Sequence, residues 1–162
     1  LNIPKIFFSY FFSITTMLES LFSLFITENT RNEVNTVAKA KNIVLLATSL
    51  ATINAFFALY SLVAGLPLMI VATCLMATIA YLIPLVVLRK TQSPVIAGTI
   101  ITMEAFCVIT ALCFMTSDTL SQVMAWFVGV PVIAAMTSGR RFSIIAGALS
   151  LLTMIVFEYM RN

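Results

Sequence analysis

Between residues 43 and 159, lysine and arginine occur only in alternate gaps between long apolar runs, and this distribution constrains the possible folds more than any other feature. Five apolar runs cover residues 43–65, 66–88, 95–115, 123–137 and 142–159. The basic residues are Arg31, Lys39 and Lys41 before the first run, Arg89 and Lys90 after the second, and Arg140 and Arg141 after the fourth. Cytoplasmic loops retain Lys and Arg because translocating them is costly. The pattern predicts a polytopic helical membrane protein whose basic gaps are cytoplasmic.

The composition argues against a soluble domain. Hydrophobic residues make up 61% of the chain and charged residues 9%, whereas a soluble domain carries roughly 25% charged residues. A helix of about 20 apolar residues crosses the hydrocarbon core, and four of the five runs are long enough. The run 123–137 is short, so it needs Gln122 and Ser138 at the interfaces or a locally thinner bilayer. The runs lack the period-two alternation of β-barrel spans.

Residues 1–41 form a separate N-terminal part of the predicted fold. The stretch 3–27 is apolar and rich in Phe, but it also contains Lys5 and Glu19. It either spans the membrane, which gives six helices, or lies in the cytoplasmic interface, which leaves five. A charged connector follows, in which Thr30 and Glu33 have the spacing of a capping box. Residues 42–162 then form a five-helix transmembrane bundle, so the predicted fold is all-α with five to six membrane helices.

Two prolines lie inside apolar runs, Pro84 in the second and Pro131 in the fourth. Each should kink its helix and free a carbonyl group about one turn earlier, because proline has no N–H to donate. Such kinks either shape a ligand cavity or serve only to improve the packing of the bundle.

The chain offers few groups for catalysis. It contains no histidine, which removes Ser-His-Asp triads and most zinc sites. Cys74, Cys107 and Cys113 are scattered through apolar runs without the spacing of metal ligands. The sequence also lacks Gly-rich phosphate loops and hydrolase motifs. The net charge of +3 is spread over loops and reports topology, not nucleic-acid binding. These observations predict a non-enzymatic chain without metal or cofactor.

Glu104 is the exceptional polar residue of the apolar runs. It lies midway along the run 95–115, where an ionised carboxylate costs at least ~2.5 kcal/mol. It should therefore face the bundle, with Asn54, Thr102 and Thr110 as candidate hydrogen-bonding partners. One interpretation is a ligand contact, a proton site or an ion-coupling site. The other is a protonated carboxyl group that holds a neighbouring helix in place by a hydrogen bond.

Small residues recur every four positions in two of the predicted spans. The stripes are Ala47, Ala51 and Ala55 in the first span and Gly139, Ser143 and Gly147 at the start of the last. Small side chains let helix backbones approach closely, either within one chain or between protomers. The expected partners are therefore the lipid bilayer and a second copy of the chain or other membrane subunits. Arg140 and Arg141 are available to anionic headgroups or to a cytosolic module.

Three short motifs resemble the membrane sensor domains of bacterial signalling proteins. They are Thr-Ser-Asp-Thr-Leu-Ser-Gln-Val-Met-Ala-Trp-Phe at 116–127, Val-Pro-Val-Ile-Ala-Ala at 130–135 and Ser-Gly-Arg-Arg-Phe at 138–142. The basic turn at Arg89 and Lys90 is similar as well. In that family about six helices precede a histidine kinase, a diguanylate or nucleotide cyclase, or a chemoreceptor signalling region. The resemblance covers about 120 residues and implies a sensory input domain in the bacterial inner membrane.

The chain departs from that family at its C-terminal end. It stops at Asn162 after the fifth helix of the resemblance, without the sixth helix or an effector. It is therefore expected to be either a portion of a larger sensor or a freestanding protein with the same architecture. Three functional classes follow: a sensory input module, a structural subunit of an inner-membrane complex such as a secretion or respiratory assembly, and a small transporter that uses Glu104.

Overall fold

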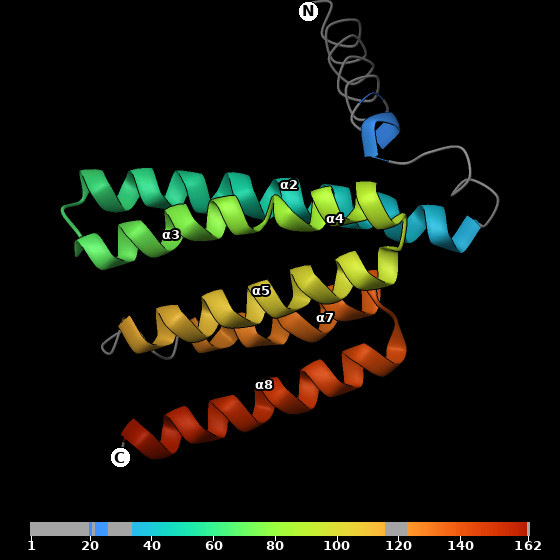
Figure 1. The fold of residues 1–162 in the computed structure, drawn as a ribbon. Coiled ribbons are helices and arrows are strands. Elements are labelled where there is room, and N and C mark those ends of the chain that lie inside the picture. The colour runs from blue at the N-terminus through green and yellow to red at the C-terminus, as the bar shows by residue number, and fades with distance from the viewer. Residues whose placement is uncertain (1–19, 21, 26–33, 116–122, 162) are drawn as a thin grey trace, which may run out of the picture.

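The computed structural model describes residues 20, 22–25, 34–115 and 123–161, and within these residues the chain is helical with no strand. The elements, from the N-terminus onward, are α2 (Val34–Val63), α3 (Leu68–Ala80), α4 (Ile83–Thr91), α5 (Pro94–Met115), the 3₁₀ turn η3 (Ala125–Val128), α7 (Gly129–Thr137) and α8 (Arg140–Arg161) (Figure 1). The predicted all-α helical bundle is confirmed.

Among the described residues, four helical stretches are long and apolar enough to cross a membrane: Thr36–Val63, Leu68–Thr91, Pro94–Met115 and Arg140–Met160. The chain is thus a multi-pass membrane protein. The remaining apolar helix, Ala125–Thr137, is shorter. At 1.5 Å per residue it rises only about 20 Å, against about 30 Å of hydrocarbon. This is the short fourth run expected from the sequence.

The N-terminal part is described only over residues 20 and 22–25, which are helical. Glu19, the capping box at Thr30 and Glu33, and most of the stretch 3–27 lie outside the described residues, so whether that stretch spans stays a prediction. Helix α2 begins at Val34 and passes residue 42 without a break. The predicted boundary between residues 1–41 and the bundle of residues 42–162 therefore falls inside a helix. No Gly or Pro interrupts the charged connector there.

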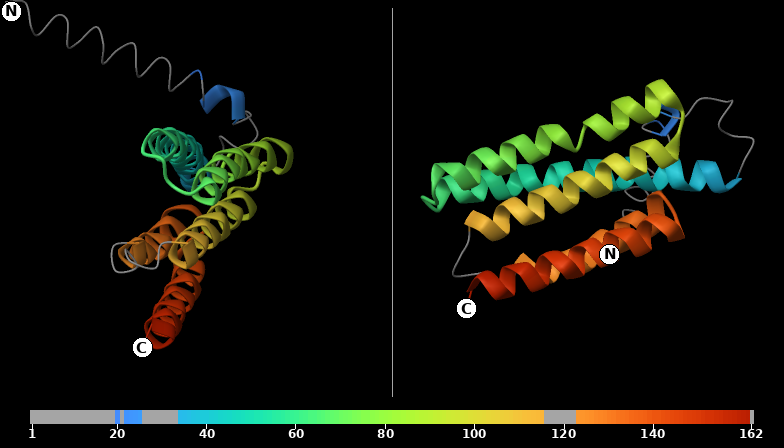
Figure 2. Two further views of the ribbon diagram at one scale, coloured as in Figure 1. Left: turned by 90° about the vertical axis from the view of Figure 1, so that its left-hand side faces the viewer. Right: turned by 60° about the horizontal axis from the view of Figure 1, so that its bottom comes forward.

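The helices form three layers (Figures 1 and 2). The first layer holds α2 with α3 and α4, the second holds α5 with α7, and α8 lies on the outer side of the second layer. At one end of the bundle α2, α5 and α8 begin while α4 and α7 end. This end, called the basic end below, carries the residues Lys39, Lys41, Arg89, Lys90, Arg140 and Arg141.

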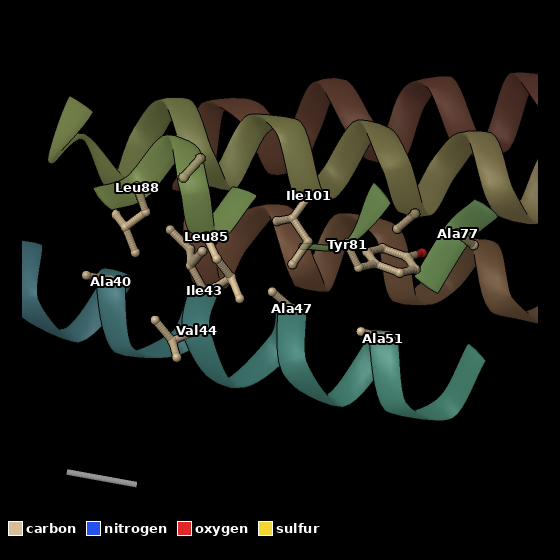
Figure 3. Close-up of a cluster of buried hydrophobic side chains, with 12 residues drawn as sticks. Ala40, Ile43, Val44, Ala47, Ala51, Ala77, Tyr81, Leu85, Leu88 and Ile101 are labelled. Carbon is tan, nitrogen blue, oxygen red and sulfur yellow. The ribbon is translucent and has the colours of Figure 1, made fainter. Parts of the chain in front are cut away.

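Helix α2 packs through a seam of small residues spaced alternately by three and four positions. Its members are Ala40, Val44, Ala47, Ala51, Ala58 and Ser61, which are buried, and Asn54, which is half-buried. This spacing averages 3.5 residues and keeps one face of a helix against its neighbour. In Figure 3, the seam residues Ala40, Val44, Ala47 and Ala51 face the second span. They lie opposite Ala77 of α3, Leu85 and Leu88 of α4, and Tyr81 between these two helices, with Ile101 of α5 beside them.

Within one chain, Ala55 lies off the packed face that Ala47 and Ala51 share. Ala47 and Ala51 are buried, but Ala55 is exposed within this chain, and Ala58 continues the packed face instead. The physical reason is the helical repeat of 3.6 residues. A strict spacing of four residues turns by about 40° at each step, so a third member leaves the face that the first two share.

The second predicted span is divided at Tyr81 and Leu82, between α3 and α4. Pro84 is the second residue of α4, and because it has no N–H, the carbonyl of Ala80 lacks its usual helical donor. The chain turns tightly instead, with the Leu82 N–H donating to the Ile79 carbonyl at 3.1 Å. The break coincides with the kink that Pro84 predicts.

Pro131 behaves differently from Pro84. It is the third residue of α7, and the turn before that helix is the 3₁₀ segment η3. A proline near a helix start is tolerated because the N–H that it lacks has no intrahelical partner there in any case. Pro131 thus lies close to a change of helix type, and no mid-helix break follows it.

Candidate functional site

Glu104 lies at the middle of α5 and is half-buried. Its Oε2 atom is buried and has no hydrogen-bonding partner within the part of the chain that the structure describes. A buried, unpaired polar atom is costly in an apolar medium, and such atoms are uncommon in native proteins. In the middle of a span an ionisable group of this kind is a functional candidate. Glu104 is therefore the centre of the candidate site.

Tyr81 is a neighbour of this carboxyl group from another part of the chain. It is buried, at 2% exposure, and occupies the first position of the break between α3 and α4. Its phenol lies close enough to Glu104 and to Cys107 for electrostatic interaction with both. The site therefore combines a carboxyl group with a phenol at a point where a spanning helix is interrupted.

The three partners predicted for Glu104 bond elsewhere, which is a correction. Thr102 and Thr110 donate their hydroxyls to the carbonyls of Gly98 and Phe106, each at 2.8 Å. The amide of Asn54 donates to the Leu50 carbonyl at 2.9 Å. All three donate to their own helix one turn back, the local bond that these side chains readily form. The residue type of a polar side chain and its depth in the membrane do not reveal whether it bonds to its own helix or to a neighbouring one.

Tyr81 was not singled out by sequence reasoning. The available signal is its position in an apolar run, three residues before Pro84. The residues one turn before a proline lie where the helical hydrogen bonds are interrupted. A carboxyl group near such a break can accept from a donor ligand or bind a cation when ionised, and when protonated it can donate. Within the described residues no group of three His, Cys, Asp or Glu side chains could hold a metal ion.

The cysteines are all free thiols. Cys74 and Cys113 are buried in apolar clusters at the end of the bundle opposite the basic end, and Cys107 is exposed. Their separate positions match structural membrane cysteines.

The small residues at the start of the last span are divided between a turn and a helix. Gly139 precedes α8 and has φ +103°, a conformation that favours glycine. Ser143 and Gly147 lie in α8 against Pro131 of α7. The Ser143 hydroxyl donates to the Pro131 carbonyl at 2.8 Å, and a Cβ atom added at Gly147 would lie 3.6 Å from the Pro131 Cβ. Within one chain, Ser143 and Gly147 therefore pack against α7.

A close approach between α5 and α7 involves Gly98, which sequence reasoning missed. A Cβ atom added there would lie 2.8 Å from both the Thr137 Cβ and the Ser138 Oγ, and 2.9 Å from the Thr137 backbone carbon. The Thr137 hydroxyl also lies 3.4 Å from the Gly98 carbonyl. The contact fixes the start of α5 against the end of α7. The available sequence signal is the spacing of Gly98 and Thr102, two small residues four positions apart.

The four basic residues of the predicted cytoplasmic turns lie together at the basic end and are exposed. Arg89 and Lys90 occupy the last turn of α4, and Arg140 and Arg141 begin α8. Lys39 joins them, with its Nζ atom 3.7 Å from where a Cβ on Gly139 would lie. This end of the bundle therefore presents a positively charged surface.

Comparison of the chain with known protein families, with characterised proteins and with solved structures finds no match. The candidate site is thus defined by its geometry: an unpaired carboxyl oxygen, a buried phenol and an interrupted helix in the middle of a membrane bundle.

Proposed function

We propose that this chain is a non-catalytic sensory input module of a bacterial inner-membrane signalling protein, and that Glu104 is its signal-receiving group. The observation that carries the proposal is the unpaired, buried Oε2 atom of Glu104 beside the break between α3 and α4. A group left unpaired in an apolar interior changes its interactions strongly when a proton, a cation or a donor ligand arrives. That change is the input.

The output in this proposal is a movement of α4. The helical hydrogen-bond ladder is interrupted at Tyr81 and Leu82, and hinge motions use a few residues at the ends of elements. Helix α4 is short and ends in Arg89 and Lys90 at the basic end. A change in how Tyr81 meets Glu104 therefore shifts the balance between two orientations of α4 and carries the signal to the membrane surface.

The test measures the distance from the end of α4 to the end of α7. Spin labels are placed at Lys90→Cys and Met136→Cys, both exposed positions, in a background without the native thiols. When Glu104 and Tyr81 are unchanged, we expect the distance distribution to change with pH, because protonation alters Glu104. Glu104→Gln should remove this response and Tyr81→Phe should reduce it.

Thr110→Val is the matched control, since Thr110 bonds within its own helix. It should retain the pH response. If the distance between the labels in the folded protein changes neither with pH nor with Glu104→Gln, Glu104 has a purely structural role and the proposal is wrong.

A transporter that couples to Glu104 is the second candidate, favoured by the same unpaired oxygen at mid-membrane depth. It requires a water-accessible path and net movement of an ion. Proteoliposomes loaded with a pH-sensitive dye separate the two candidates: the sensor predicts no proton flux, and the transporter predicts flux that Glu104→Gln abolishes.

The cytoplasmic assignment of the basic end is tested by labelling. We expect a cysteine at Gln92 to react only from the cytoplasmic side and one at Thr119 only from outside, because the basic turns stay inside. Reaction of both from one side would refute this orientation.

A further inference from the structure

An apolar groove lies between α5 and α8. It encloses about 40 Å³ and is partly open, with Thr99, Met103 and Phe106 on the α5 side and Phe142, Ile145 and Leu149 on the α8 side. The Thr99 hydroxyl donates to the Val95 carbonyl at 2.8 Å. Thr102 also lines the groove and donates its hydroxyl to the Gly98 carbonyl at 2.8 Å, so both hydroxyls of the wall are satisfied and the groove offers almost purely apolar contact.

The groove exists because α8 is held on α7. The Ser143 hydroxyl bonds to the Pro131 carbonyl, and Gly147 packs against the same residue. Because of these contacts, α8 turns its packed face toward α7 and makes far less contact with α5. A narrow, elongated space between the two helices is the result.

The apolar lining of the groove follows the helix axes, as a hydrocarbon chain in a bilayer does. The lining residues run from Thr99 to Phe106 on α5 and from Phe142 to Leu149 on α8, about 10 Å along each helix. The stretch on α8 lies in the half of the bundle nearer the basic end, and the stretch on α5 reaches from that half to the middle of the helix. A chain that enters from the leaflet at the basic end and follows the helix axes matches this geometry.

Positive charge lies beside the end of the groove that is nearer the basic end, called its mouth below, because Phe142 of the lining directly follows Arg141. Arg141 lies one turn before Ile145 on the same side of α8, and Arg140 adjoins it. The first turn of α8 contains no acidic residue. In the described part of the chain the two carboxylates are Glu104, at mid-span, and Glu158, near the opposite end of α8. Lys39 lies against the turn that precedes α8.

We propose that this groove and the arginines at its mouth bind one anionic phospholipid of the leaflet at the basic end. An acyl chain occupies the space between α5 and α8, and the headgroup phosphate contacts Arg140 and Arg141. Arginine suits this role because its planar guanidinium group binds phosphate with two parallel hydrogen bonds. The site is separate from Glu104 and does not depend on the proposed sensory function.

The experiment measures lipid binding by native mass spectrometry of the detergent-purified chain, titrated with phosphatidylglycerol or with phosphatidylcholine. We expect one tightly bound phosphatidylglycerol and much weaker phosphatidylcholine. The double variant Arg140→Gln/Arg141→Gln should bind phosphatidylglycerol roughly 30-fold more weakly, given the usual contribution of each basic residue near an anionic headgroup. The matched charge control is Arg89→Gln/Lys90→Gln, which should change binding far less.

The groove is tested separately from the charge. Ala146 also lines the groove, so Ala146→Phe fills the space and should abolish binding of the tight lipid. Ala148→Phe, on an exposed part of the same helix, should not. Thr99→Phe fills the groove from the α5 side and provides the same test should Ala146→Phe fail to fold.

Three outcomes would overturn the proposal. Equal losses in the two double variants would show that only the general charge of the basic end attracts lipid. Equal binding of phosphatidylcholine would show an acyl site without headgroup recognition. Unchanged binding in folded Ala146→Phe and Thr99→Phe would show that the groove does not hold the lipid, as would a second copy or another helix found there by crosslinking.

Discussion

The helices α2 to α5 and the helix α8 meet the membrane in different ways. In the most apolar 18-residue stretch of Leu68–Thr91, 39% of the residues are buried inside the bundle, compared with 11% in that of Arg140–Met160. The sequences give little warning of this difference, since both are apolar spans of similar length. The comparison teaches that lipid and protein interior are nearly equivalent solvents for apolar side chains, so small residues and polar contacts decide which helices pack.

The largest effect is expected at the contact between α5 and α7. Gly98→Ala adds a methyl group less than 3 Å from atoms of Thr137 and Ser138, one of them in the backbone. Overpacking of this kind costs about 1–3 kcal/mol, and we expect the upper part of that range because the backbone must move. Thermal unfolding in detergent, followed by circular dichroism, measures the loss.

Gly129→Ala is the control for Gly98→Ala. An added Cβ at Gly129 meets nothing within 4 Å, and its φ of −69° suits alanine. It should leave stability unchanged or raise it by up to about 1 kcal/mol. Equal destabilisation by the two substitutions would contradict the close approach of α5 and α7.

The next largest effect is expected on the α2 seam. Ala51→Leu places three extra carbons in a buried position and should cost about 1–2 kcal/mol, whereas Ala55→Leu, on the exposed side, should cost almost nothing. The same thermal measurement compares the two. If Ala55→Leu proves the more harmful, Ala55 contacts a second copy or another subunit, and chemical crosslinking in membranes would detect that partner.

A smaller effect is expected where α8 meets α7. Gly147→Leu must push Pro131 away from a Cβ contact of 3.6 Å, but α8 can tilt outward into lipid, so we expect a loss of about 1 kcal/mol. The variant should insert normally and lose thermal stability before any oligomer dissociates. Ala148→Leu, exposed on the same helix, is the control. Loss of oligomers at unchanged thermal stability would instead assign Gly147 to a contact between protomers.

The smallest effect is expected from a single hydrogen bond. Ser143→Ala removes the donor to the Pro131 carbonyl, and such bonds between membrane helices average about 0.6 kcal/mol. Protease accessibility of α8 in detergent is the sensitive measurement, because local detachment precedes global unfolding. A loss comparable with that of Gly98→Ala would show that α8 belongs energetically to the core.

Features governed by local chemistry could be predicted from the sequence. Apolar run lengths predicted the spans, including the short helix that ends at Thr137, and Pro84 predicted the position of the break between α3 and α4. These follow from the number of residues needed to cross a bilayer and from the missing N–H of proline. Neither requires knowledge of which helices are neighbours.

Features that depend on a distant partner could not be predicted. The importance of Gly98 comes from Thr137, which is 39 positions away, and the environment of Glu104 includes Tyr81 in the break between α3 and α4. The threonines near Glu104 were the obvious partners by type, but their hydroxyls reach their own helix first. Only the arrangement of the helices reveals these contacts.

The break between α3 and α4 also changes the electric field inside the membrane. An unbroken span has its helix dipole charges at the two surfaces, where water and headgroups screen them. Here the negative C-terminal end of α3 and the positive N-terminal end of α4 meet at Tyr81 and Leu82, within the bundle. Screening is weak at that depth. Any ion that approaches Glu104 therefore enters a region already polarised by the backbone, in a layer of the bilayer that otherwise holds almost no fixed charge.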